Sequence, residues 1–277
     1  MVSADEPVPP MICAVLGSPI SHSLSPAMHR AAYAHLGLDW SYEPVEVRAG
    51  ELAQFVGALG DDVRGLSVTA PLKREAASVA HQRSGDVETL GVANTLIVED
   101  GMISAHNTDV PGGEAALHER GVGSPVTARI LGGGATAASM ALTLARAGAE
   151  QIEFIVRDAT RAAEAEAVVR GRGIGVTIRL FDEPLIDRVD LLVSTVPGDA
   201  VGARSYELVD AARAVFDVVY DPWPTPLGHA AEEAGVPVVS GLDLLAHQAA
   251  LQVELMTGQQ VSPQLLRDAA LGALPTR

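Results

Sequence analysis

The 277-residue chain has a single cysteine, Cys13, and aromatic side chains make up only 4% of its residues. One cysteine cannot form a disulfide within the chain, which fits a reducing compartment such as the cytosol. Because aromatic residues are so few, the core has to be built from Ala, Val, Leu and Ile. That composition suits α/β layers better than a β-sandwich. Cys13 lies in an apolar run and is expected to be a small buried hydrophobic residue.

Basic residues are also scarce, since 19 lysines and arginines face 35 acidic residues and the net charge is −16. Such a charge repels nucleic acid and anionic membrane surfaces, so neither is expected as a partner. No apolar run approaches the length of a membrane span. Residues 1–10 lack the basic and apolar regions of a signal peptide and are expected to form a frayed tail. These features favour a cytoplasmic protein.

Lys73 follows an apolar run that ends at a proline. Pro71 has no N–H and disfavours helical geometry in the residue before it, which predicts a strand ending near Thr69 and a helix over 73–79. Lys73 would then lie at the carboxyl end of a strand, where open α/β sheets bind ligands. A solvated lysine in an ordinary helical turn is the structural alternative. Asp109 stands at the next strand-to-helix turn, from which a carboxylate can reach a lysine on a neighbouring strand end.

Ser25 and Pro26 are typical of a helix start, with serine at the N-cap and proline in the first turn. Capping alone would explain Ser25. The functional interpretation is that Ser23 and Ser25, beside the free N–H groups of a helix N-terminus, bind an anion such as a carboxylate. Three nearby histidines match no common metal-ligand spacing and are interpreted as packing or surface residues, and no metal is expected; they are His22, His29 and His35.

A strand over 126–131, a glycine turn, a helix through 139–146 and a strand over 152–156 form a βαβ pattern. The spacing Gly132-x-Gly134-x-x-Ala137 in that context predicts a dinucleotide-binding fold. Arginine at the end of the second strand accommodates the 2′-phosphate of NADP, whereas an acidic residue binds the ribose hydroxyl of NAD. Arg157 and Arg161 therefore favour NADP. Asp158 keeps NAD open, unless it caps the next helix and pairs with Arg161.

The remaining pattern is an alternation of strands and helices. Asn94 is a polar residue in the apolar segment that leads into a strand. Its side chain can hydrogen-bond the backbone of a local turn or a substrate hydroxyl. Gly101 marks a hairpin turn, and 121–125 is expected to be a linker. Further strands are predicted over 11–16, 41–47, 176–181, 190–196, 214–220 and 236–240, and helices over 27–36, 51–59, 110–120, 243–256 and 263–271, with another opening at Thr225.

Several separated motifs, in this order, resemble the shikimate dehydrogenase family over nearly the whole chain beyond the first ten residues. The matching segments are 17–26, 67–73, 93–96, 107–109, 220–227 and 241–249. The resemblance implies a two-domain α/β fold. A discontinuous substrate domain would comprise 11–109 and 243–277, and a Rossmann-type NADP-binding domain would comprise 110–242. It also implies reversible reduction of 3-dehydroshikimate to shikimate with NADPH, in the chorismate pathway to aromatic amino acids.

The resemblance implies a role for each matching residue. Lys73 and Asp109 form the catalytic pair, in which the carboxylate favours the ammonium form of the lysine as proton donor to the carbonyl oxygen. Ser23 and Ser25 bind the substrate carboxylate. The ring hydroxyls are held by Thr69, Asn94, Tyr220 and Gln248. The cofactor is bound by Gly132, Gly133, Gly134, Ala135, Thr136, Arg157, Arg161, Val218 and Gly241.

The chain departs from the family pattern at three places. Serine stands at Ser67 where the family often has asparagine, and leucine at Leu72 where it often has phenylalanine, so packing beside Lys73 is expected to differ. The family often has Asn-Arg-Thr where this chain has Val156-Arg157-Asp158, so the choice of cofactor is less secure than the reaction.

Three alternatives stay open. One is a related enzyme that prefers quinate or an amino analogue of shikimate. Another is a non-catalytic dinucleotide sensor that kept the fold. The third is a folate-linked dehydrogenase, which would not need the serine carboxylate site. The sequence also leaves the oligomeric state open, with a homodimer as one candidate.

Overall fold

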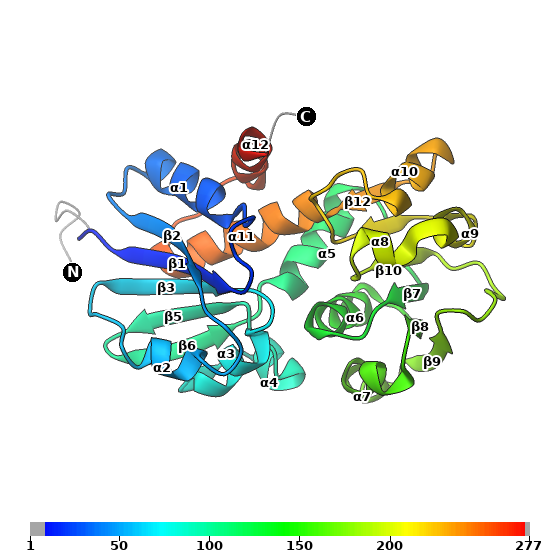
Figure 1. The fold of residues 1–277 in the computed structure, drawn as a ribbon, viewed down its shortest axis with the longest axis horizontal. Helices are drawn as coiled ribbons and strands as arrows, with labels where there is room; N and C mark the ends of the chain where they lie inside the picture. Colours follow the sequence, from blue (N-terminus) through cyan, green and yellow to red (C-terminus); the bar gives the residue numbers. More distant parts are fainter. Residues whose placement is uncertain (1–8, 275–277) are drawn as a thin grey trace. The chain divides into compact units, whose positions relative to one another are not determined.

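The computed structural model describes residues 9–274, which divide into two compact units (Figure 1). Unit 1 holds the residues up to Thr108 together with those from Ala249 onward, and unit 2 runs from Asp109 to Gln248. Most of the expected N-terminal tail, residues 1–8, lies outside the described residues. Of its last two residues, both exposed, Pro9 accepts a hydrogen bond from the indole N–H of Trp40 at 3.0 Å through its backbone oxygen.

Unit 1 is built on a mixed six-stranded sheet in the order β2-β1-β3-β5-β6-β4. Three strands run parallel at one side, and a tight hairpin turn at Asp100 and Gly101, both with positive φ, joins the antiparallel pair β5 and β6. The strands are β1 (Ile12–Gly17), β2 (Ser41–Glu46), β3 (Val63–Val68), β4 (Gln82–Arg83), β5 (Thr95–Glu99) and β6 (Met102–His106).

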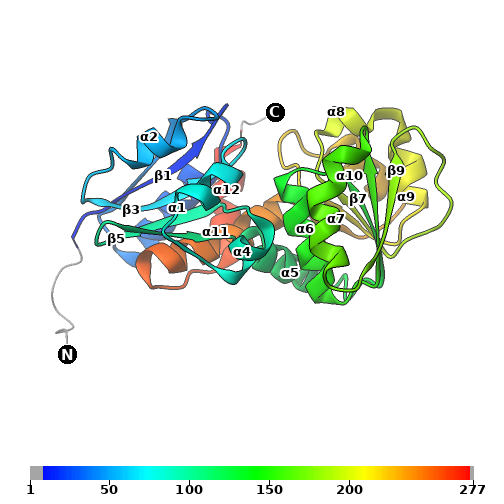
Figure 2. The same cartoon turned by 90° about the horizontal axis from the view of Figure 1, so that it is seen from below.

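Helices cover both faces of this sheet (Figures 1 and 2). An aliphatic core including Leu16, Leu66 and Leu96 lies on the face that packs against α2 (Leu52–Val56), α3 (Lys73–Val79) and α4 (Gly85–Leu90). Side chains alternate along a strand, so Ser67 and Thr95 point to the opposite face. That face carries α1 (Ser25–Leu36), α11 (Gly241–Thr257) and α12 (Pro263–Ala273).

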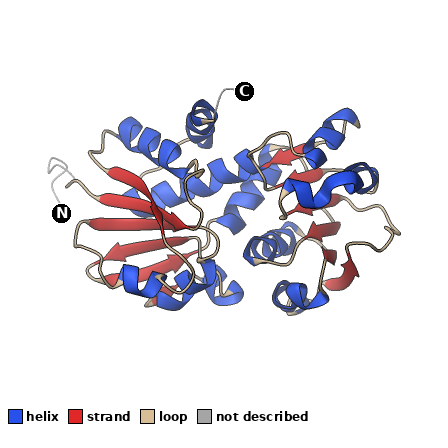
Figure 3. Ribbon diagram, in the orientation of Figure 1, coloured by secondary structure: helices blue, strands red, loops and turns tan. Residues whose placement is uncertain are grey.

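Unit 2 is built on a parallel six-stranded sheet in the order β12-β11-β10-β7-β8-β9 (Figure 3). The first strand in sequence is central and the order reverses beside it, which is the arrangement of dinucleotide-binding folds. Helices α6 and α7 lie on one side of the sheet, and α9 and α10 on the other (Figure 2). The strands are β7 (Thr127–Leu131), β8 (Gln151–Val156), β9 (Gly175–Leu180), β10 (Leu191–Ser194), β11 (Val215–Asp217) and β12 (Val238–Ser240).

The helices of unit 2 begin with α5 (Asp109–Glu119) and α6 (Ala135–Ala147). After β8 come the 3₁₀ turn η1 (Ala159–Ala162) and α7 (Ala163–Arg170). The elements α8 (Gly198–Val201), η2 (Gly202–Arg204), α9 (Ser205–Asp210) and α10 (Pro226–Glu233) follow. Buried aliphatic residues such as Leu192, Val215 and Leu227 form the core between the sheet and α9 and α10.

The predicted fold class, α/β with a discontinuous first domain and a Rossmann-type second domain, is confirmed. The predicted domain boundaries stay predictions, because α11 runs unbroken from Gly241 to Thr257 and contributes to both units. No helix within residues 9–274 is long and apolar enough to cross a membrane.

Several element predictions are wrong in detail. The helix expected over 51–59 spans only Leu52–Val56, and the strand expected over 190–196 spans only Leu191–Ser194. The strand expected over 214–220 ends at Asp217, because its carboxylate accepts from the Val219 N–H at 3.2 Å and from the Thr225 hydroxyl at 2.6 Å. An aspartate that bonds the backbone two residues on turns the chain out of the strand. The segment entering β5 contains the unpredicted helix α4, whose Val87 and Leu90 are buried.

Candidate active site

The serine loop lies between β1 and α1 in unit 1. Gly17 packs so closely that a Cβ there would be 2.5 Å from a methyl of Thr69, so the loop rests on the end of β3. Helix α1 begins at Ser25, with a proline in its first turn as predicted. The N-cap prediction for Ser25 is wrong, since Leu24 is the N-cap and makes no side-chain cap bond. The hydroxyl of Ser23 instead accepts from the Ser25 N–H at 3.3 Å.

Thr69 and Lys73 lie where the sequence predicts, at the carboxyl end of β3. The Thr69 N–H donates to the Leu16 carbonyl at 2.8 Å, and the Thr69 carbonyl accepts from the Leu72 N–H at 2.9 Å. Lys73 opens α3, and its backbone oxygen accepts from the Ala93 N–H at 2.8 Å. The side chain of Leu72 is fully buried in the core below. These hydrogen bonds hold the backbone around Lys73 in place.

Asn94 is buried between β3 and β6 in unit 1. Its carbonyl accepts from the Val68 N–H at 2.7 Å, so it lies beside the end of β3. Its side-chain oxygen accepts from the Thr108 N–H at 2.8 Å and from the Thr95 hydroxyl at 2.9 Å, and its side-chain nitrogen donates to the Thr108 hydroxyl at 2.9 Å. A backbone N–H can only donate, so the Asn94 amide has one fixed orientation. A ligand that binds the Asn94 amide would therefore accept a hydrogen bond from its side-chain N–H group.

The three histidines of the first segment do not form a metal site. His29 is fully buried and donates from Nδ1 to the Ser25 carbonyl at 2.9 Å, whereas His22 and His35 are exposed. No group of three or more His, Cys, Asp or Glu residues within 9–274 is arranged to hold a metal ion. Cys13 is buried, as predicted, and burial raises the pKa of its thiol to about 11.

The glycine turn of unit 2 joins β7 to α6, as the motif predicts. Gly132 has a φ of +108°, and a Cβ there would lie 2.5 Å from the Thr195 hydroxyl oxygen. A Cβ on Gly133 would overlap the backbone carbonyl of Arg161. Gly134 caps α6 in an extended conformation and has no atom within 4 Å of where a Cβ would be. Two glycines thus serve close packing within the protein, and the third leaves open space at a helix N-terminus.

Ala135 and Thr136 form the first turn of α6, and both are partly exposed. The open backbone at this N-terminus suits a phosphate, because the first N–H groups of a helix have no partner within the helix. The residues present therefore fit a dinucleotide pyrophosphate.

Arg157, Asp158 and Arg161 are all exposed after β8. The Asp158 carboxylate caps η1 by accepting from the Thr160 N–H at 2.9 Å and the Thr160 hydroxyl at 2.8 Å, and these bonds lower its pKa. The capping alternative for Asp158 is therefore observed. Because the Arg161 backbone packs on Gly133, the loop that carries both arginines is anchored to the glycine turn.

The remaining predicted cofactor and substrate residues lie in the same unit. A Cβ on Gly241 would overlap the backbone carbonyl of Val218, so these two predicted cofactor residues lie side by side. Tyr220 follows β11 in the loop that Asp217 turns, and burial, aided by the Asp221 charge, raises the pKa of its phenol.

Asp109 and Gln248 also belong to unit 2. Asp109 is the buried first residue of α5 and directly follows Thr108. Gln248 lies on α11, where its side-chain nitrogen donates to the Leu245 carbonyl at 2.9 Å. The two helices touch at Gly112, where a Cβ would be 2.9 Å from the Gln248 backbone nitrogen. Glycine at this position lets α5 and α11 pack closely.

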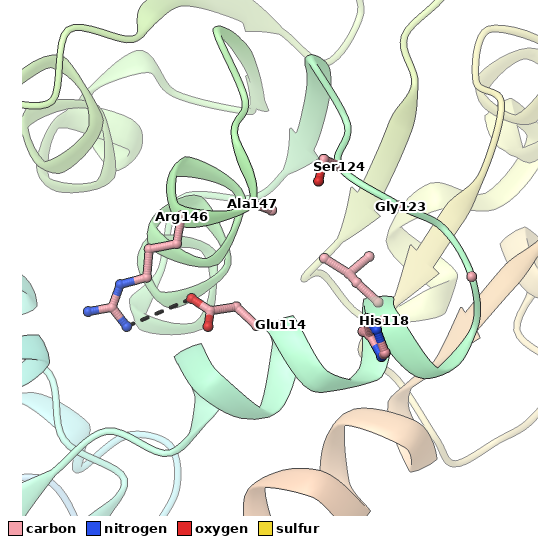
Figure 4. A pocket seen from close by; sticks show the side chains of 8 residues that line it. Glu114, His118, Gly123, Ser124, Arg146 and Ala147 are labelled. Atoms are coloured by element: carbon pink, nitrogen blue, oxygen red, sulfur yellow. Dashed lines mark ion pairs between the residues drawn. The ribbon is translucent and has the colours of Figure 1, made fainter.

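A separate pocket of about 460 Å³ lies at the other end of α6 (Figure 4). It is lined by the end of α5, the loop after it and the end of α6, where Arg146 and Glu114 point toward one another at 3.8 Å. None of the predicted site residues lines it. The glycine turn lies at the opposite end of α6, and a helix of 13 residues is about 20 Å long.

Sequence reasoning missed two sets of residues. Thr195 lies at the end of β10, next to β7, and its hydroxyl donates to the Leu131 carbonyl at 2.7 Å beside Gly132. The rule that ligands bind at strand ends beside the central strand could have found it. The second set is the buried group around Asn94, namely Tyr42, Thr95, Thr108 and Gln252. Thr95 and Thr108 lie within the matching segments 93–96 and 107–109, but no local motif marks Tyr42 or Gln252, whose side chains join the group only in the folded chain.

A Rossmann unit with an open glycine turn, together with a unit that places a lysine and an oriented amide at neighbouring strand ends, defines a dinucleotide-dependent oxidoreductase. The comparisons with known proteins identify which one. Residues 15–96 match the family description "Shikimate dehydrogenase substrate binding domain", and residues 241–271 match "Shikimate 5'-dehydrogenase C-terminal domain".

The relatives extend this match over the chain. A shikimate dehydrogenase (NADP(+)) of Methanopyrus kandleri is 36% identical over 278 residues, covering 94% of each chain. The crystal structure of Mycobacterium tuberculosis shikimate dehydrogenase has a TM-score of 0.86 at 35% identity, covering 95% of this chain and 100% of that one. Shikimate 5-dehydrogenase from Thermus thermophilus, solved with NADP(H) and shikimate, has a TM-score of 0.83 at 32% identity, covering 95% and 100%. The chain belongs to the shikimate dehydrogenase family.

Proposed function

We propose that this protein catalyses the reversible, NADP-dependent interconversion of 3-dehydroshikimate and shikimate. The chain belongs to a family whose members at 32–36% identity carry that name, and the Thermus relative was solved with both ligands. The observation that carries the proposal is the pair of backbone bonds that hold Lys73 and Asn94 at neighbouring strand ends, Ala93 N–H to Lys73 at 2.8 Å and Val68 N–H to Asn94 at 2.7 Å.

The residues of unit 1 suit a hydroxylated carboxylic acid. Ser23 and Ser25 stand at the start of α1, where hydroxyl groups and a helix N-terminus favour a carboxylate. Asn94 donates an N–H to a ring hydroxyl oxygen, since its own oxygen is committed to Thr95 and Thr108. Thr69 contributes a second hydroxyl at the end of β3. Tyr220 and Gln248 complete the set of hydroxyl ligands in the proposal.

The cofactor would be held by unit 2. Its pyrophosphate would approach the open Gly134 backbone and the first turn of α6, and Arg157 and Arg161 would bind the 2′-phosphate. Thr160 engages the Asp158 carboxylate, which supports NADP over NAD. When bound, the nicotinamide supplies or accepts the hydride. Val218 and Gly241 would line the same site.

Lys73 would act as the general acid in reduction by protonating the carbonyl oxygen as it becomes a hydroxyl. In the reverse direction the neutral amine would accept that proton. Asp109 is proposed as the carboxylate that supports the ammonium form. This pairing rests on the family resemblance of 67–73 and 107–109.

The catalytic assignment is tested by Lys73→Ala, with the exposed neighbouring cation removed in Arg74→Ala as the control. Loss of the group that accepts the proton in oxidation, and donates it in reduction, should lower kcat by roughly 10²–10⁴-fold with a smaller effect on KM, whereas Arg74→Ala should stay near wild type. Steady-state rates of shikimate oxidation measure both. A rise in KM for shikimate at unchanged kcat would make Lys73 a binding residue and sink the acid–base role.

The cellular location and the oligomeric state are also part of this proposal. We place the enzyme in the cytoplasm, which the single, buried cysteine supports. A homodimer is the proposed oligomeric candidate, and sedimentation equilibrium over a range of concentrations would detect or reject it.

A further inference from the structure

A line of buried polar side chains crosses the α1 and α11 face of the unit 1 sheet. The Tyr42 hydroxyl donates to Ser67 at 2.6 Å, and the Ser67 hydroxyl donates to the Gln252 side-chain oxygen at 2.8 Å. The Gln252 side-chain nitrogen donates to the Thr95 hydroxyl at 3.0 Å, which donates to the Asn94 side-chain oxygen at 2.9 Å. All five residues are at most 3% exposed. We call these five residues the polar relay.

The strand register places the relay residues together. Ser67 on β3 and Thr95 on β5 are direct partners across the antiparallel pair. Gln252 lies on α11 over both, one helical turn before Met256, which packs on Gly65 of β3. Two residues of a strand and four residues of a helix both span about 6 Å. The spacing of Gln252 and Met256 along α11 therefore matches that of Ser67 and Gly65 along β3.

The two side-chain amides, Gln252 and Asn94, give the relay a direction. Each hydroxyl in the relay can both donate and accept, so a row of hydroxyls alone could point either way. The Gln252 amide has an acceptor end and a donor end, and its nitrogen also donates to the Asn94 carbonyl at 3.1 Å. That second bond fixes which end faces β5, since a carbonyl can only accept. The Thr95 hydroxyl is thereby left to donate to Asn94.

The other end of the relay reaches the serine loop. His29 stacks on the Tyr42 ring at 4.1 Å between centroids and donates to the Ser25 carbonyl, so it joins Tyr42 to the serine loop. The relay therefore connects Ser25, the proposed carboxylate ligand, with Asn94, the proposed hydroxyl ligand. The same group of buried side chains therefore supports both Ser25 and Asn94.

We propose that Gln252 is a positioning residue for the substrate: through Thr95 and the Asn94 carbonyl it holds Asn94 in place in the orientation that the Thr108 N–H gives it, so that the amide presents an N–H to a hydroxyl oxygen of the substrate. The inference deepens the proposed function and rests on it. Gln252 itself does not touch the reacting atoms. Ser67 is part of the same arrangement, because its hydroxyl donates to the Gln252 side-chain oxygen at 2.8 Å.

The test removes the hydrogen-bonding groups of one relay side chain at a time while keeping its approximate shape. Gln252→Met keeps the length of the side chain, and Thr95→Val keeps its branching. Each should raise KM for shikimate by about tenfold, the effect of losing one well-oriented hydrogen bond, while KM for NADP⁺ stays within about twofold of wild type. Thr95→Ser restores the hydroxyl and should restore KM. Tyr33→Phe removes a neighbouring buried hydroxyl that bonds Met256 outside the relay, and should leave both KM values unchanged.

Thermal unfolding is measured on the same variants. A purely structural role would lower the melting temperature and leave both KM values as in wild type, and that result would overturn the inference. An equal rise in KM for Thr95→Ser and Thr95→Val would overturn it too. If Gln252→Met does not fold, the Thr95 pair decides by itself. The wild-type enzyme, assayed alongside, reports separately on the proposed function, since its failure to oxidise shikimate would refute that function whatever the variants do.

Discussion

Gly133 and Gly134 are neighbours in the chain but lack side chains for different reasons. A Cβ on Gly133 would overlap the Arg161 carbonyl, so alanine there should disturb the folded protein. Gly134 has open space around it and an ordinary negative φ of −84°, so alanine there should fit the folded protein without strain. Only a ligand that comes close to the backbone would meet that methyl group.

Gly134→Ala should therefore raise KM for NADP⁺ by about tenfold while its unfolding free energy stays within about 0.5 kcal/mol of wild type. Gly133→Ala is the matched comparison and should lose stability as well as cofactor affinity. Cofactor titrations and urea unfolding of both variants provide the readout. If Gly134→Ala bound NADP⁺ as tightly as wild type, the pyrophosphate would not lie at this turn.

His29 should make the stability of the protein depend on pH. Burial lowers the pKa of its imidazole to about 4, although the bond to the Ser25 carbonyl opposes this. In the unfolded chain the pKa is near 6.5, so between about pH 6.5 and pH 4 the unfolded state binds a proton that the folded state does not. Stability is fully present above pH 6.5 and falls by about 3 kcal/mol as the pH drops to 4. The stacked Tyr42 stays neutral in this range, because burial raises its pKa.

Urea unfolding between pH 7.5 and pH 4 measures this effect against the background of the other titrating groups. His29→Gln should show a shallower loss of stability than wild type. His35→Gln, which changes an exposed histidine on the same helix, should follow the wild-type curve. An identical slope for His29→Gln and wild type would contradict the assignment.

At the scale of elements, the packing of α5 on α11 depends on a residue without a side chain. A Cβ on Gly112 would lie within about 3 Å of backbone atoms of Gln248, which cannot move aside as a flexible side chain can. Gly112→Ala should lower the free energy of unfolding by about 1–3 kcal/mol, the usual cost of overpacking. Differential scanning calorimetry of the variant would measure it.

Gly272→Ala is the control for that change. Gly272 lies in α12, is exposed and has nothing within 4 Å of where a Cβ would be, so alanine should leave stability unchanged or raise it by up to about 1 kcal/mol. Equal effects of the two substitutions would mean that the contact between α5 and α11 does not limit stability.

Elements with strong local signals could be predicted from the sequence, and those set by distant contacts could not. Pro71 and the following Lys73 place α3 within one residue, and the Thr225 cap opens α10 as expected. The β11 strand was predicted too long, because its end depends on a bond between Asp217 and Thr225, eight residues apart. The site shows the same limit, since Gln252 meets Asn94 across 158 positions of the chain.

At the scale of the whole molecule, the chain pairs a Rossmann unit with a second α/β unit that carries Ser23, Ser25, Thr69 and Asn94, four of the six proposed substrate ligands. The fold alone is compatible with a dinucleotide sensor. The oriented Asn94 amide, the serine loop and Lys73 favour an enzyme acting on a hydroxylated acid. An enzyme that prefers quinate would share most of these groups, so only turnover separates the two.

The most direct test of the account is the initial rate of oxidation with shikimate and with quinate, each offered NADP⁺ and NAD⁺. We predict turnover of shikimate with NADP⁺ and much slower rates in the other three combinations. The relatives at 32–36% identity are named shikimate dehydrogenases (NADP(+)), Thr160 engages the Asp158 carboxylate, and Arg157 and Arg161 are the proposed ligands of the 2′-phosphate. Comparable rates with quinate or NAD⁺ would contradict the assigned specificity. No turnover in any combination, by a protein that still binds NADP⁺, would contradict the enzyme itself and support the sensor.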